Sequence, residues 1–129
     1  MRQLSLIALA AVFVWGFILF PSDHALAAPE QTGVFQEQVM AINLEKRTIF
    51  TYSEKTIRIF PMNPVVGKTK IVPLGKDEEV PLSRLKNGQW IAVKGKRFYD
   101  FENHAPTIDA RVIYLLPDKV APEKLKELE

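Results

Sequence analysis

The feature that most constrains the fold is a series of short strand-like segments with no room for helices between them. In residues 56–60, Ile57 and Ile59 fall on one face and Arg58 on the other, the two-residue period of a half-buried strand. Five such segments occur, at residues 34–44, 48–52, 56–60, 89–94 and 108–116. Because parallel α/β sheets need crossover helices, the sequence predicts an all-β domain.

A short helical turn is predicted in the connection between the third and fourth segments. Pro81 suits a first helical position, and Gly88 suits the left-handed residue that closes a turn. Leu82 and Leu85 would then lie on one end of a barrel, and residues 70–72 are a candidate short strand. This order predicts a small five-stranded Greek-key barrel, OB-fold-like, with a short helical turn between strands 3 and 4.

Strand phase also predicts which residues form the core. We expect one core that contains Ile57, Ile59, Ile91, Val93 and Ile113. Gly95, inside the fourth strand pattern, indicates a bulge or bend. We expect the chain to leave regular pairing there, so that an irregular loop precedes the last strand.

The N-terminal residues predict export. An arginine precedes an apolar stretch, residues 4–20, and Pro21 ends it. The sequence Ala25-Leu26-Ala27 then reads as a cleavage point, so residues 1–27 are predicted to be a secretory signal peptide. The alternative is an uncleaved segment that anchors the protein in the inner membrane. Beyond it we expect a disordered lead-in (28–33), the barrel domain (34–117) and a charged C-terminal tail, at most a short helix (118–129).

The chain contains no cysteine. Disulfides, thiol catalysis, cysteine-ligated zinc and a lipid-modified N-terminal cysteine are therefore excluded. A cysteine-free exported domain fits a bacterial periplasm or secretion into the medium better than a eukaryotic secretory route.

A motif in the second half of the domain resembles a known family. Leu85 and Lys86 precede Gly88, Trp90-Ile91, Val93 and Gly95. This rhythm is similar to that of small exported bacterial OB-fold domains of unknown function, and the resemblance covers residues 34–116. It implies an OB-fold outside the cytoplasm. OB-fold haem chaperones of the periplasm attach haem through a histidine after the last strand, but residues 116–119 contain none.

Catalytic motifs are missing from the sequence. Neither Ser53 nor Ser83 has nucleophile-elbow glycines, and no phosphate-binding loop or zincin motif occurs. We therefore expect a protein that is not an enzyme and carries no cofactor. One metal-binding alternative remains, because Asp100, Glu102 and His104 alternate and would share a face in an extended segment.

The centre of the chain is basic. Residues 46–97 carry twelve Lys/Arg against four Asp/Glu, a local balance of +8, whereas residues 28–45 and 98–129 each come to −3. Residues 94–99 are basic or aromatic apart from Gly95, and two further lysines lie on the long connection between the third and fourth strand segments. The predicted binding residues are Lys68, Lys70, Lys94, Lys96, Arg97 and Tyr99. In the alternative interpretation the lysines only solubilise the surface while Phe98 and Phe101 plug the barrel end.

These observations predict a non-enzymatic binding or assembly module of the bacterial cell envelope. OB barrels bind single-stranded nucleic acid through such surfaces, but nucleic acid is scarce in that compartment. We therefore expect an anionic or protein partner in the envelope. A membrane role as a tethered structural subunit would require retention of the N-terminal segment, and a small metal-binding periplasmic protein is the other alternative.

Overall fold

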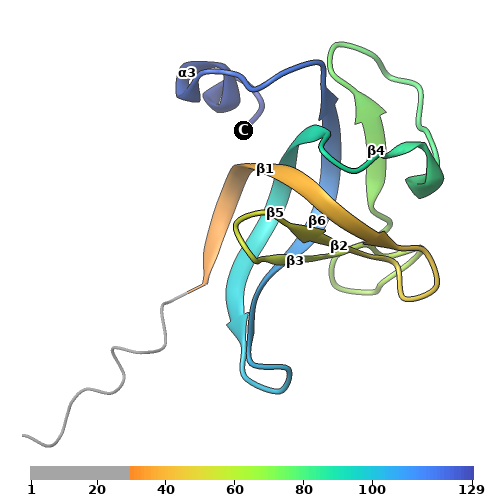
Figure 1. Cartoon of the computed structure of the whole chain (residues 1–129), viewed down its shortest axis with the longest axis vertical. Coiled ribbons are helices and arrows are strands. Elements are labelled where there is room, and N and C mark those ends of the chain that lie inside the picture. Colours follow the sequence, from red (N-terminus) through yellow and green to blue (C-terminus); the bar gives the residue numbers. More distant parts are fainter. Residues whose placement is uncertain (1–29) are drawn as a thin grey trace, which may run out of the picture.

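The computed structural model describes residues 30–129 of the 129-residue chain. These residues form six strands, one 3₁₀ turn and one short helix (Figure 1). The strands are β1 (Gln31–Asn43), β2 (Thr48–Thr51), β3 (Thr56–Arg58), β4 (Lys70–Pro73), β5 (Trp90–Asp100) and β6 (Ala105–Leu116). The 3₁₀ turn η1 spans Leu82–Arg84, and helix α3 spans Pro122–Lys126.

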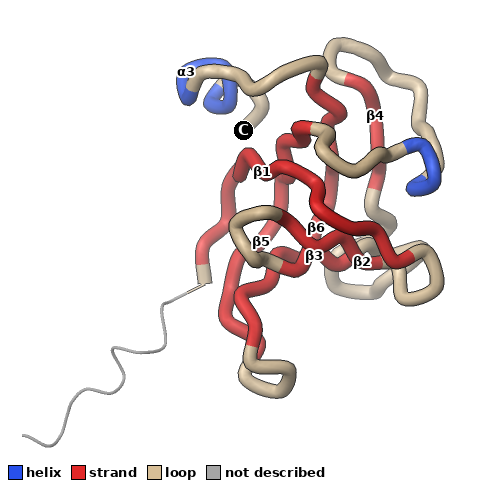
Figure 2. Tube along the Cα trace, in the orientation of Figure 1, coloured by secondary structure: helices blue, strands red, loops and turns tan. Residues whose placement is uncertain are grey.

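Five of the strands close into a barrel, in the order β1-β2-β3-β6-β5 and back to β1 (Figure 2). All neighbouring pairs in this ring are antiparallel except β3 and β6, which are parallel. Strand β4 adds to β6 as an extra parallel neighbour. Because η1 follows β4, it lies between the third and fourth strands of the barrel. The predicted OB-fold-like barrel with a helical turn at this position is confirmed.

Aliphatic side chains fill the barrel interior. All five residues that strand phase placed in one core belong to it, namely Ile57, Ile59, Ile91, Val93 and Ile113. Leu82 and Leu85 are also buried against this core, so the helical turn covers one end of the barrel as predicted. Gly88, which follows η1, has a φ of +88°, the left-handed conformation predicted for the closing residue.

A second apolar cluster lies on the outer side of β1 and β5, next to α3 (Figure 1). Its buried members are Val34, Ala92 and Leu116, and the tail residues Val120, Leu125 and Leu128 pack against them. The tail that was predicted as charged is therefore amphipathic. It contains the short helix that the prediction allowed, and its apolar residues cover a sheet face that would otherwise be exposed.

Two predicted boundaries are corrected by the structure. Strand β1 begins at Gln31, so residues 31–33 of the predicted disordered lead-in pair with β5. The prediction of an irregular loop between residues 95 and 108 is wrong, because β5 continues to Asp100 and β6 already begins at Ala105. Backbone hydrogen bonds hold these strand ends together. Because such bonds do not depend on the side chains, the ends lack the apolar alternation that identifies a strand in the sequence.

Gly95 marks a bulge, as predicted, but the extra residue is on the partner strand. Lys94 pairs with Val112 and Gly95 pairs with Ala110, which leaves Arg111 of β6 unpaired. A β-carbon on Gly95 would lie 2.1 Å from the carbonyl oxygen of Asp109. Glycine is therefore required by the close approach of the two backbones.

The predicted signal peptide, residues 1–27, lies outside the described residues. Within residues 30–129, no helix has the length and apolar character needed to cross a membrane.

Candidate functional site

Three lysines of the predicted binding set lie on one outer side of the sheet. Lys70 of β4 pairs with Val112 of β6, and Val112 pairs with Lys94 of β5. Cross-strand partners point to the same side of a sheet, and so do residues two apart on a strand, which places Lys96 there as well. Val93, next to Lys94, is fully buried in the core. The lysines therefore face away from the barrel interior.

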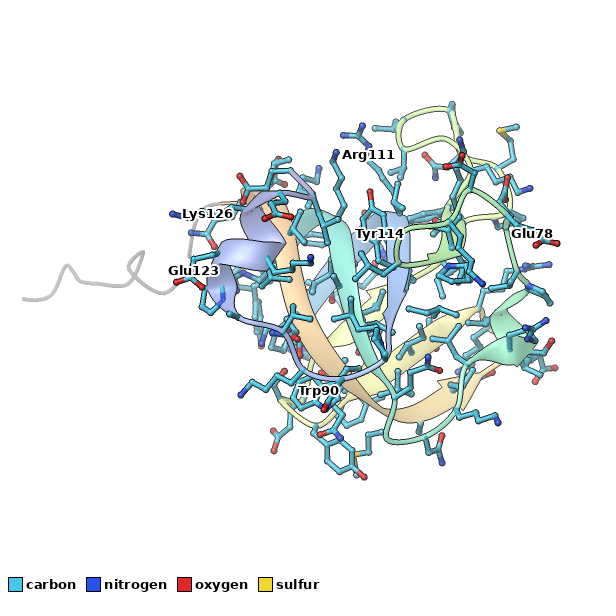
Figure 3. All side chains as sticks on the ribbon, turned by 90° about the horizontal axis from the view of Figure 1, so that it is seen from above. Glu78, Trp90, Arg111, Tyr114, Glu123 and Lys126 are labelled. Atoms are coloured by element: carbon cyan, nitrogen blue, oxygen red, sulfur yellow. The ribbon has the colours of Figure 1, made fainter. Side chains whose placement is uncertain are left out.

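Arg111 adds a fourth positive charge, which the sequence analysis did not single out. It is the unpaired residue of the bulge and is exposed. Figure 3 shows Arg111 and Tyr114 on the same side of β6. The available signal was a single arginine in an otherwise apolar run of residues, 110–116. We call Lys70, Lys94, Lys96 and Arg111 the cationic face.

Within residues 30–129, most of the charge on the cationic face has no acidic partner. Among residues 30–129, no ion pair involves Lys70, Lys94 or Arg111. Lys96 pairs with Glu30 at 3.7 Å, and its ammonium lies 5.9 Å from the centre of the Phe98 ring. Because neighbouring strands are only about 5 Å apart, the three free charges reinforce one another and produce a local positive potential.

A partly buried ion pair lies beside Lys96 and anchors this part of the sheet. The guanidinium of Arg58 donates two hydrogen bonds to Asp109, at 2.5 and 2.8 Å, and Asp109 is 7% exposed. The rings of Phe98 and Phe60 flank the guanidinium at 5.3 and 5.8 Å. The hydrogen bond to Asp109 raises the pKa of Arg58, and burial opposes this effect. Since Asp109 neutralises Arg58, the arginine adds no net charge to the cationic face.

Two residues of the predicted set have other environments. Lys68 forms an ion pair with Glu79 at 3.3 Å, so its charge is balanced. Arg97 pairs with the core residue Ile108 and therefore points to the side of the sheet opposite to Lys96. Its guanidinium lies 4.5 Å from the centre of the Phe35 ring.

Tyr99 is also separated from the cationic face. Its ring contacts that of Phe101 edge-on at 4.8 Å, at the end of the β5–β6 hairpin, where Phe101 is 59% exposed. Phe98 points outward and packs against Arg58. The alternative in which Phe98 and Phe101 plug the barrel is therefore wrong. The reason is that β5 continues past Gly95 as a paired strand, and its alternation turns Phe98 outward.

The residues of the metal-binding alternative lie at a tight turn. Asp100 ends β5, and its carboxylate accepts hydrogen bonds from the backbone of Glu102 and from the Asn103 side chain, the latter at 2.8 Å. The Asn103 hydrogen bond lowers the pKa of Asp100. His104 has a φ of +52° in the same turn. The extended segment that this alternative requires does not form, and residues 30–129 contain no group of three ligands close enough to hold a metal.

A second polar cluster closes the β2–β3 hairpin. Glu37 is 6% exposed, accepts a hydrogen bond from the Ser53 hydroxyl and pairs with Lys55 at 3.2 Å. Thr51 accepts a hydrogen bond from the backbone N–H of Lys55 at 3.1 Å. Each of these side chains has a partner within the cluster, which ties the β2–β3 turn to Glu37 of β1, so its evident role is to hold the turn.

Comparison with known proteins adds no relative. No protein-family model, curated protein or solved structure matches the chain. The observations that bear on function are therefore the barrel and the charges on its surface.

Proposed function

We propose that this protein is an exported, non-enzymatic binding or assembly module of the bacterial envelope, whose cationic face binds an anionic partner. One observation carries the proposal. Lys70, Lys94 and Arg111 come from three adjacent strands, point to one side and have no acidic partner within residues 30–129. Like charges close together raise the free energy of the folded protein unless counter-ions or a ligand balance them. Such an arrangement favours binding of an anion.

Export in this proposal rests on the N-terminal sequence and on the resemblance to exported OB-fold domains. If residues 1–27 are a signal peptide, mass spectrometry of protein from the native bacterium will find Ala28 as the first residue. Intact Met1 in the membrane fraction would instead favour the anchored alternative.

Binding is tested with two variants of equal charge. The first, K70Q/K94Q/R111Q, removes the three free charges of the cationic face. The probe is heparin, a soluble polyanion, and its affinity is measured across a salt series. At about 0.5 kcal/mol for each exposed ion pair, we expect the first variant to bind about tenfold more weakly, with a reduced salt dependence.

The matched control is K46Q/K76Q/R84Q, which removes two lysines and one arginine from exposed positions off the cationic face. We expect it to retain most of the affinity, and both variants should keep the stability of the wild type. Equal losses in the two variants would show that net charge alone governs binding, and the cationic face would have no special role. Affinity capture from the native envelope, with the first variant as the negative control, then identifies the partner.

A further inference from the structure

An ordered loop presents two large apolar side chains to water. Met62 is 75% exposed and Val65 is 86% exposed, the highest values among the large hydrophobic residues of the described chain. The Asn63 side-chain oxygen accepts hydrogen bonds from the backbone of Val65 and Val66 at 2.8 and 2.9 Å. Gly67, at a φ of +84°, donates to the Asn63 carbonyl at 2.7 Å. The exposure is therefore built into the folded loop.

This loop is fastened to the strand that carries Arg111. The Thr69 hydroxyl donates to the carbonyl oxygen of Ala110 at 2.6 Å, and Thr69 is only 5% exposed. Two further hydrogen bonds join the backbone of Thr69 to Phe60 and the Phe60 N–H to the Thr69 hydroxyl, both at 2.9 Å. Lys70 follows directly as the first residue of β4. We call residues 61–69 the apolar loop. It ends directly before Lys70 of the cationic face, and Figure 3 shows it beside Arg111.

Exposed apolar side chains next to cations without an acidic partner in residues 30–129 fit one partner better than others. A soluble polyanion offers nothing to Met62 or Val65, whereas an anionic bilayer offers phosphate groups to the cations and acyl chains to the apolar side chains. Long lysine side chains can also lie along the boundary with their ammonium groups in the headgroup layer.

We infer that the cationic face docks on the surface of an anionic lipid bilayer and that Met62 and Val65 insert into its headgroup boundary. This inference rests on the proposed function and names the class of its partner. It requires no transmembrane segment, because the contact is peripheral.

The test is co-sedimentation of the processed protein with vesicles of phosphatidylcholine alone or mixed equally with phosphatidylglycerol. We expect binding to the mixed vesicles and little to the neutral ones. At about fivefold per cation, K70Q/K94Q/R111Q should lower the partition coefficient roughly a hundredfold. Removal of the apolar pair in M62Q/V65N should lower it about tenfold. Circular dichroism confirms that each variant is folded.

The apolar control is M40Q/L44N, which changes exposed residues of the β1–β2 region and should bind like the wild type. Because the chain has no cysteine, a single V65C or L44C variant can also carry an environment-sensitive dye. Mixed vesicles should shift the emission of the dye to the blue at position 65 and leave it unchanged at position 44.

The outcomes separate this inference from the function it extends. Binding to heparin without binding to mixed vesicles overturns bilayer docking and leaves the anion-binding function intact. Loss of both overturns the two together. Vesicle binding that M62Q/V65N does not weaken, with no blue shift at position 65, overturns insertion of the loop.

Discussion

Replacement of Arg58 by methionine leaves a carboxylate that the fold buries without a partner. Asp109 is 7% exposed, and both of its oxygens accept hydrogen bonds from the guanidinium. Methionine preserves most of the apolar stem between Phe60 and Phe98, so the perturbation is mainly the loss of charge and hydrogen bonds. Lys96, the cross-strand neighbour of Asp109, already pairs with Glu30 and can replace the arginine only in part.

The magnitude follows from the unequal burial of the two partners. Loss of one partner from a buried ion pair costs about 3–5 kcal/mol, and because the Arg58 side chain is 40% exposed, solvent screening places R58M near the lower limit. In D109N the guanidinium can turn to water, so we expect a loss of only about 1 kcal/mol. The double variant R58M/D109N should be more stable than the sum of the two losses indicates, by about 1.5 kcal/mol.

The free energy of unfolding is measured by urea denaturation followed by circular dichroism, with the slope checked for constancy across the variants. Arg84→Met is the control, because Arg84 is exposed on η1 and forms no ion pair among the described residues. It should change the stability by no more than about 0.5 kcal/mol. If R58M is as stable as D109N, or if the two losses simply add, the argument from unequal burial is refuted.

Two further predictions concern the bulge and the hairpin turn. Gly95→Ala should lose about 3 kcal/mol of stability in the same assay, because its β-carbon would lie 2.1 Å from the Asp109 carbonyl oxygen. Gly33→Ala is the control: its nearest contact is at 3.6 Å, so it should lose about 1 kcal/mol or less. Equal losses in the two variants would show that the clash at Gly95 does not govern stability. Asn103→Ala should raise the pKa of Asp100 toward its ordinary value of 3.8, as measured by an NMR titration of the carboxyl carbon. Because folding lowers the pKa of Asp100, the stabilisation from this turn is present above the unfolded-state pKa and is lost as the pH falls through the folded-state pKa. If Asp100 titrates unchanged in Asn103→Ala, another group lowers its pKa.

Local patterns in the sequence were sufficient to predict the barrel. The alternation of Ile57 with Arg58 and of Ile91 with Val93 identifies strands and their buried faces, because the side-chain period of a strand is fixed by backbone geometry. Pro81 and Gly88 marked the helical turn, because proline has a fixed φ that suits the start of a helical turn and glycine readily adopts the positive φ that closes one. These are properties of single segments, so they can be read without knowing what each segment contacts.

The cationic face and the extent of the β5–β6 hairpin were decided only by the tertiary structure. Sequence proximity grouped Lys96 with Arg97, but consecutive residues on a strand point to opposite sides. Lys70 and Arg111 are far apart in the chain and meet because β4 and β6 pair in parallel, a register that no local pattern encodes. The same holds for the apolar loop, whose position beside Arg111 depends on a hydrogen bond from Thr69 across 41 residues of sequence. The sequence alone therefore determined the central part of each barrel strand and its buried face, whereas strand pairing decided how far the strands extend and which charges act together.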